Sequence, residues 1–201
     1  SGWQVLITHG NGPQVGFIML RSEIARSVAG LHIVPLVSCV ADTQGAIGYQ
    51  IQQALDNVLR RRGLAEKAGR TVSLVTQVRV DIADPGFTDP DKFVGEFYTE
   101  DQIPGLREQH PDWVLKPDAD RGWRRVVPSP KPCEIIELDA VRSLLGAGFN
   151  VVAVGGGGIP VVRMPEGLFG VDAVIDKDLA STLLANQLGA DLLAISTGVQ
   201  N

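Results

Sequence analysis

Short apolar runs rich in β-branched residues alternate along the chain with longer segments in which apolar residues recur at helical spacing. This alternation is typical of an α/β fold, in which a doubly wound, mostly parallel sheet carries helices on both faces. The runs that predict strands are residues 4–8, 33–40, 71–80, 150–154 and 192–196.

The segments between these runs predict helices. Pro13 is expected to begin the first of them, because a proline in the first turn costs no hydrogen bond, and Gly30 is expected to end it. The other predicted helices span residues 44–62, 134–145 and 178–188, and each is followed by a glycine.

Residues 81–132 interrupt the alternation and hold most of the prolines and two of the three tryptophans. A loop of this length inside a compact domain usually has structure of its own or a function. We expect 1–201 to form one domain, with 99–125 as a small protruding lid subdomain that closes over a site. A surface insertion without a role fits the same composition.

Composition and charge argue against several classes of binding partner. The formal net charge of −5 comes from interspersed acids and bases, so the sequence shows no basic block of the kind that binds nucleic acid or an anionic membrane. No uninterrupted apolar run reaches the roughly 18 residues of a membrane span. The two cysteines, Cys39 and Cys133, lack the spacing of a zinc site or a disulfide framework. We therefore expect a cytoplasmic protein that acts on small molecules.

Two glycine-rich loops follow predicted strands and are the first candidate site. Glycines let backbone N–H groups approach an anion, and loops at the carboxyl ends of strands meet at one crevice. The first loop also fits an ordinary turn, whereas four consecutive glycines cost more backbone entropy than a turn requires. The candidate residues are Gly10, Asn11 and Gly12 in the first loop and Gly155, Gly156, Gly157 and Gly158 in the second.

Charged residues at the start of the helix 178–188 are the second candidate. Lys177 stands between Asp176 and Asp178, which fits a solvated charge beside an aspartate cap. It equally fits a phosphate site, with Lys177 as a point charge for phosphoryl oxygens and Asp178 as the residue that orients it. Lys92 lies in a predicted loop.

Several segments, in the same order, resemble the carbamate kinases of the amino acid kinase family over nearly the whole chain. The matching segments are HGNGPQVG at 9–16, QGAIGY at 44–49, TQVRVD at 76–81, DP at 84–85, RRVVPSPKP at 124–132, GGGGIP at 155–160 and AVIDKD at 173–178.

The resemblance implies a three-layer sheet of the amino acid kinase type with a lid, a homodimer, and reversible phosphoryl transfer between Mg-ATP and carbamate. The products would be ADP and carbamoyl phosphate. Residues 10–12 and 155–158 would surround the carbamate or the transferring phosphoryl group. Lys92 and Lys177 would neutralise its charge, and Asp178 would position the lysines. Mg²⁺ would be held largely by nucleotide phosphates and water.

The family pattern also begins with a strand and a Gly-Gly-Asn loop and ends with a part that completes the nucleotide pocket. We expect both parts to lie outside this chain, which would then be a central portion. Two alternatives stay open: a sister kinase for another small carboxylate or phosphate, and a non-catalytic member that keeps the fold as a binding or regulatory domain.

Overall fold

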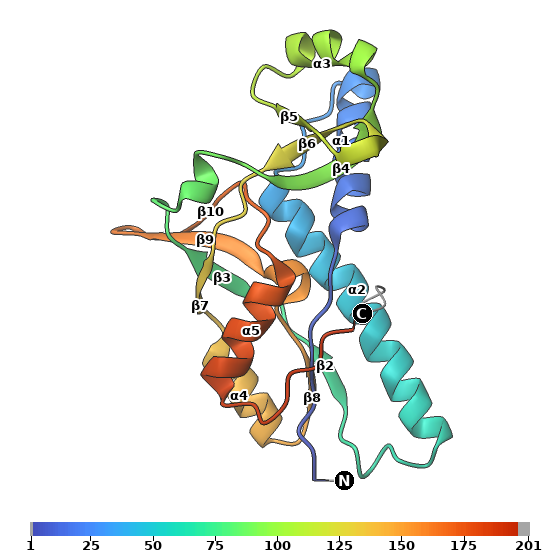
Figure 1. The fold of residues 1–201 in the computed structure, drawn as a ribbon. Coiled ribbons are helices and arrows are strands. Elements are labelled where there is room, and N and C mark those ends of the chain that lie inside the picture. The colour runs from blue at the N-terminus through green and yellow to red at the C-terminus, as the bar shows by residue number, and fades with distance from the viewer. Residues whose placement is uncertain (1, 197–201) are drawn as a thin grey trace.

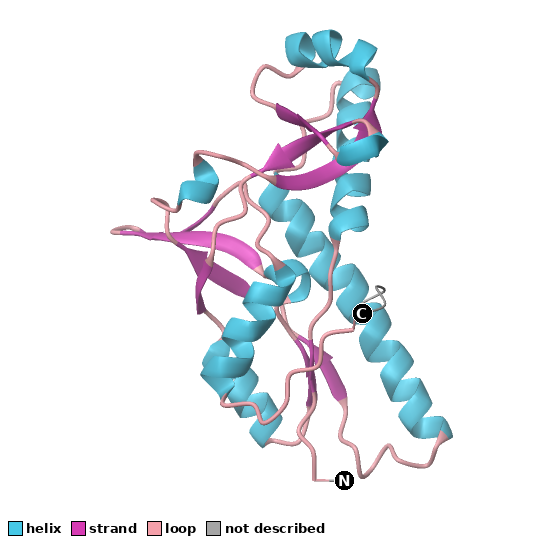
Figure 2. Cartoon of the chain, in the orientation of Figure 1, coloured by secondary structure: helices cyan, strands magenta, loops and turns pink. Residues whose placement is uncertain are grey.

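A computed structural model describes residues 2–196 and confirms the α/β fold class (Figure 1). Figure 2 separates helices, strands and loops in the same view. The helices are α1 (Gly12–Ala29), α2 (Leu36–Arg61), α3 (Ile103–Gln109), α4 (Leu138–Gly146) and α5 (Lys177–Leu188), with short 3-10 turns at Pro85–Phe87, Glu100–Gln102, Ala119–Arg121 and Gly155–Gly157. The strands are β1 (Leu6–Ile7), β2 (Thr71–Ser73), β3 (Gln77–Val80), β4 (Lys92–Tyr98), β5 (Val114–Pro117), β6 (Trp123–Val127), β7 (Pro132–Ile135), β8 (Asn150–Val152), β9 (Ile159–Met164) and β10 (Gly167–Gly170).

The central sheet consists of two consecutive pieces. In the first, β1 and β2 pair in parallel with β8 on either side. In the second, β9 pairs in parallel with β3, and the outer strands β7 and β10 are antiparallel. The predicted strand 71–80 is therefore broken at residues 74–76, and the strand predicted at 150–154 ends at Val152. Strand structure is interrupted at both places, and both interruptions lie beside the candidate site.

Helices cover both faces of this sheet, as the sequence pattern predicts. The long helix α2 packs against β2 and β8 from one side, while α4 packs against β8 from the other (Figure 1). The main core between the layers is made of aliphatic side chains, including the fully buried Val78, Val151, Ile175 and Leu184. Burying each such side chain stabilises the fold by roughly 1.5–3 kcal/mol.

A separate antiparallel sheet, in the order β4-β6-β5, projects beyond the main body together with α3 (Figure 1). Its strands begin at Lys92 and end at Val127, so this protruding unit is larger than the expected range 99–125. It packs on α1 through Val94 and Val127, which share a second core with Val15 and Met19.

The strand predicted at 33–40 is wrong. Residues from Leu36 onwards belong to α2, which begins directly after Pro35. Leu36, Cys39 and Val40 are buried at the spacing i, i+3, i+4, which is the inner face of a helix. A nearly continuous apolar run concealed this helical period.

Two other predicted elements also differ from the structure. Residues 192–196 form no strand, and the Leu192 side chain is 69% exposed, because no described strand pairs with this segment. The helix predicted at 134–145 begins only at Leu138, since Glu134 lies in β7 and pairs across the sheet with Arg79.

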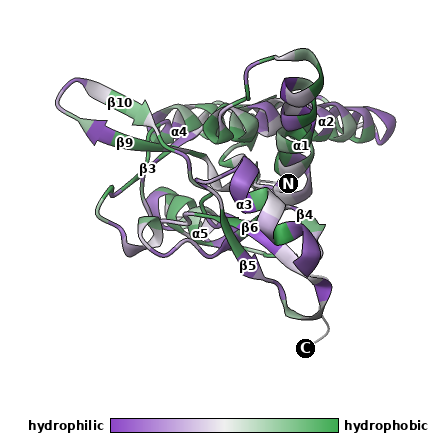
Figure 3. Ribbon diagram, turned by 90° about the horizontal axis from the view of Figure 1, so that it is seen from above, coloured by the Kyte–Doolittle hydropathy of each residue, from purple (hydrophilic) through white to green (hydrophobic). Residues whose placement is uncertain are grey.

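Figure 3 shows hydrophilic as well as hydrophobic positions along α1 and α2. Accordingly, within residues 2–196 no helix combines the length and the apolar character needed to cross a bilayer.

The packing of α2 on β2 predicts unequal effects of adding a methyl group at two glycines of the same helix. A Cβ at Gly48 would meet the Ser73 side chain, with 3.0 Å to the Ser73 Cβ, whereas a Cβ at Gly45 meets nothing within 4 Å. We expect the Gly48→Ala variant to be less stable than Gly45→Ala by about 1–3 kcal/mol. Urea unfolding of both variants measures this difference, and equal stabilities would contradict the close packing.

Candidate functional site

The glycine run after β8 is buried and tightly surrounded. Gly156, Gly157 and Gly158 all have positive φ, between 66° and 91°, a region that glycine adopts without steric cost. A side chain would have no room at any of the run's positions: it would meet the His9 ring at Gly155, the Asn11 amide at Gly156, the Ile175 carbonyl at Gly157 and the Val78 side chain at Gly158. Residues 155–158 therefore offer only backbone atoms to the neighbouring elements that pack against them.

Val154, just before the run, has φ 54° and ψ 32°, which is unusual for a β-branched residue. Such a conformation costs about 1–3 kcal/mol and persists only where the surroundings determine it. Its N–H donates to Thr76 Oγ1 at 3.1 Å, and Val154 is completely buried. The bend into the glycine run is thus held by Thr76, which lies in the break between β2 and β3.

The first glycine loop rests on this run. The Gly156 N–H donates to the His9 carbonyl oxygen at 2.7 Å. The Asn11 side chain is 4% exposed and donates to Thr43 Oγ1 at 2.8 Å. Asn11 therefore anchors the loop inward, whereas Gly10 and Gly12 on either side of it are exposed.

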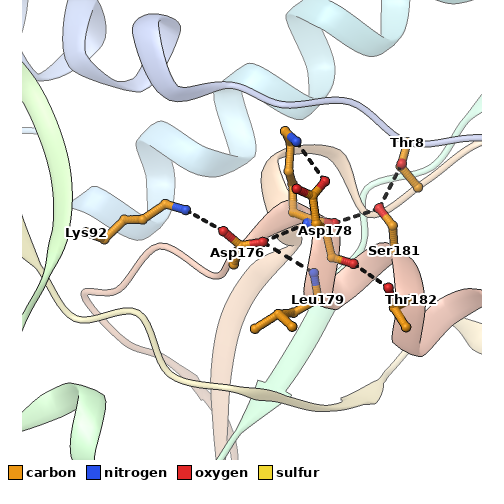
Figure 4. Close-up of polar contacts among 8 residues, drawn as sticks. Thr8, Lys92, Asp176, Asp178, Leu179, Ser181 and Thr182 are labelled. Atoms are coloured by element: carbon orange, nitrogen blue, oxygen red, sulfur yellow. Dashed lines mark hydrogen bonds and ion pairs between the residues drawn. The ribbon is translucent and has the colours of Figure 1, made fainter. Parts of the chain in front are cut away.

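Lys177 lies over the first loop from the start of α5. A Cβ built at Gly10 would be 3.0 Å from Lys177 Cδ, so the lysine stem crosses this glycine. Lys177 Nζ donates to Asp178 Oδ1 at 2.7 Å. Asp176 caps the helix, and its Oδ1 accepts the N–H groups of Asp178 and Leu179 at 2.9 and 3.3 Å (Figure 4).

Lys92 reaches the same helix end from the protruding sheet. It is the first residue of β4 rather than a loop residue, and its Nζ donates to Asp176 Oδ2 at 2.8 Å (Figure 4). Asp178 contacts Lys177, while Asp176 is the partner of Lys92. The two lysines thus pair with carboxylates two positions apart at the start of α5.

Opposing effects set the charge of Asp176. Burial favours its neutral form, but the Lys92 ammonium and the N–H groups of Asp178 and Leu179 outweigh burial and hold the pKa of Asp176 below its usual value. The ionised Asp176 carboxylate therefore balances the charge of Lys92.

The carboxylates of this site do not form a metal cage. Within the part of the chain that the structure describes, no group of three or more His, Cys, Asp or Glu side chains could hold a metal ion. Asp176 and Asp178 are both engaged by lysines.

Comparisons with known proteins agree with this geometry, although no family model matches the chain. A carbamate kinase-like protein of Escherichia coli, YahI, is 53% identical over 201 residues, which cover 100% of this chain and 62% of YahI. The carbamate kinase of Pyrococcus horikoshii is 48% identical over 198 residues, covering 98% of this chain and 62% of that enzyme. The chain is homologous to carbamate kinases along its whole length. It spans less than two thirds of these relatives.

Solved structures show the same relationship in three dimensions. Carbamate kinase from Giardia lamblia bound to citric acid matches with a TM-score of 0.84 and 46% identity, over 94% of this chain and 60% of that one. The same enzyme bound to AMP-PNP matches with a TM-score of 0.81 and 46% identity, over 94% of this chain and 58% of that one. The observed fold is therefore that of the carbamate kinases.

Several residues around the site were not singled out by sequence reasoning. Asp176 carried a usable signal, because an aspartate before a predicted helix is a preferred N-cap. Gln44 belongs to the matching segment 44–49, but its partners lie 32 and 111 residues away. No local sequence pattern points to Thr43, because its hydrogen bond with Asn11 forms only when the first glycine loop packs on α2.

The partly buried Lys92–Asp176 pair predicts a measurable coupling energy. A double-mutant cycle with Lys92→Met and Asp176→Asn should give about 0.5–1 kcal/mol at pH 7. Because the pKa of Asp176 is lowered from 3.8, this coupling should persist above that pH and disappear as pH falls through the folded-state pKa. Asparagine keeps the helix cap, so the cycle reports on charge alone.

The pair Lys116–Asp89 is the matched control for that cycle. It has the same 2.8 Å separation, but the Asp89 side chain is 84% exposed. Urea unfolding should give a coupling near zero for Lys116→Met with Asp89→Asn. Equal coupling energies in the two cycles would show that burial at the α5 start adds nothing.

Proposed function

We propose that this protein is a carbamate kinase, which transfers a phosphoryl group reversibly between ATP and carbamate. The observation that carries the proposal is the meeting of Lys92, Lys177 and the exposed glycines of the first loop at the start of α5. The homology to carbamate kinases supports it independently.

The chemistry asks for charge stabilisation rather than for a general base. Carbamate is already an anionic nucleophile, and the phosphoryl group it attacks is negative too. Two unit charges about 4 Å apart repel by roughly 4 kcal/mol at an effective dielectric near 20. Ammonium groups and aimed N–H donors offset this repulsion, which is the main requirement of phosphoryl transfer.

Each candidate residue has a distinct role in this proposal. The exposed backbone of Gly10 and Gly12, with the positive end of α1, binds the anion, and Asn11 holds their loop in place. Residues 155–158 form the floor of the site beneath Asn11. Lys177 stabilises the charge that develops on the phosphoryl oxygens, and Asp178 orients Lys177.

Lys92 gives the protruding sheet a role as a lid. Its ammonium belongs to β4, so any movement of the sheet β4-β6-β5 moves this charge relative to α5. An arriving phosphoryl group competes with Asp176 for Lys92. We expect the lid to place Lys92 against the phosphoryl oxygens when substrate is bound.

Mg-ATP is the proposed cosubstrate. The complex of the Giardia lamblia enzyme with AMP-PNP supports a nucleotide, and the absence of a carboxylate cage among residues 2–196 fits a cation carried by its phosphates. A homodimer, expected from the family resemblance, and a cytoplasmic location, expected from the composition, complete the proposal.

Removing the Lys177 ammonium should abolish most of the activity without unfolding the protein. In full-length protein we expect Lys177→Ala to lower kcat for ATP formation from carbamoyl phosphate and ADP by about a thousandfold. This loss corresponds to an increase of about 4 kcal/mol in the activation free energy. A coupled assay of ATP measures this. Lys67, exposed in the turn after α2, is the control, and Lys67→Ala should keep full activity. Comparable rates for the two variants would exclude Lys177 from the proposed role.

A further inference from the structure

Gln44 of α2 is a buried polar residue that the proposed mechanism does not use. Its side chain is 2% exposed, and its amide is fully engaged with backbone groups. Oε1 accepts the Thr76 N–H at 2.8 Å, and Nε2 donates to the carbonyl oxygens of Thr76 and Gly155, both at 3.0 Å. Two carbonyl neighbours at one end and an N–H at the other define the orientation of the amide.

This amide connects the break at residues 74–76 with the start of the glycine run. The two hydrogen bonds with the Thr76 backbone hold the segment between β2 and β3 in place. The hydrogen bond to the Gly155 carbonyl oxygen holds the start of the glycine run. A run of glycines has no side chains to restrict its own backbone, so its conformation depends on such external bonds. Gln44 supplies one of these hydrogen bonds, the one to the Gly155 carbonyl oxygen.

The bond to Gly155 continues through the peptide groups of both loops. The Gly155 carbonyl and the Gly156 N–H belong to one planar peptide and point in opposite directions. The Gly156 N–H donates to the His9 carbonyl oxygen at 2.7 Å. That carbonyl shares the next planar peptide with the Gly10 N–H, which therefore points away from the core.

The end of this hydrogen-bond chain is a free donor at the proposed anion site. Among residues 2–196 the Gly10 N–H donates to no protein acceptor, and Gly10 is exposed beneath the stem of Lys177. Hydrogen bonds in series polarise one another, so a donor at one end strengthens the donor at the other.

We propose that Gln44 is a positioning residue that aims the Gly10 N–H at the phosphoryl group through the peptides 155–156 and 9–10. This inference rests on the proposed function, because it takes the phosphoryl group as the ligand. Thr43, the neighbour of Gln44, holds Asn11 of the same loop. Two adjacent residues of α2 thus hold both glycine loops.

The test replaces Gln44 by methionine, which has nearly the same length but no amide. Gln52→Met is the matched control, because Gln52 also lies on α2 and accepts a strand N–H, that of Ser73, at 3.1 Å without contacting a glycine loop. Affinity of the full-length protein for carbamoyl phosphate is measured by calorimetry, and the Gly10 amide is followed by NMR during the titration.

We expect Gln44→Met to weaken carbamoyl phosphate binding about tenfold, the loss of one well-aimed hydrogen bond, and to reduce the ligand-induced shift of the Gly10 amide. Gln52→Met should leave both unchanged at a similar loss of thermal stability. Unchanged affinity and an unchanged Gly10 shift in Gln44→Met would overturn the proposal.

A second variant covers the case in which Gln44→Met does not fold. Gln44→Glu keeps the acceptor for the Thr76 N–H and replaces the two amide donor contacts by at most one carboxyl O–H, so we expect weaker carbamoyl phosphate binding in this variant too. Wild-type protein that binds carbamoyl phosphate but forms no ATP from ADP would contradict the proposed kinase activity, while the ratio of variant to wild-type affinity still decides the role of Gln44.

Discussion

The contact between the two glycine loops, made by the Gly156 N–H and the His9 carbonyl oxygen, is the interaction on which the site depends. It requires four positions without side chains after β8, since any Cβ there would meet His9, Asn11 or the neighbouring backbone and side chains. It also requires a strained turn at Val154, which is stabilised by Thr76. Because of this contact, the first loop is held against the buried glycine run.

Each lysine of the site is paired with a carboxylate. Lys92 is paired with Asp176, and Lys177 is paired with Asp178. Unpaired ammonium groups would repel each other and the positive end of α5, so the carboxylates allow both lysines to remain close to it. In the proposed function a phosphoryl group would compete with these carboxylates, and for Lys92 that competition would also bear on the protruding sheet.

Local sequence signals predicted the fold class, the bounds of α1 and α5, and the two loops, because prolines, glycines and helical periods act over a few residues. They failed at residues 33–40, where a buried helix face reads as an apolar strand. They also missed the partnership of Lys92 with Asp176 and that of Gln44 with Gly155, which join residues 84 and 111 positions apart. Such contacts depend on how elements pack, and no local pattern reports them.

The most direct test is a crystal structure of the full-length protein with carbamoyl phosphate. We expect the phosphoryl oxygens to lie within hydrogen-bonding distance of Lys177 Nζ and the Gly10 N–H, with Lys92 drawn from Asp176 toward the ligand. A phosphoryl group bound away from the first glycine loop and the start of α5 would contradict it.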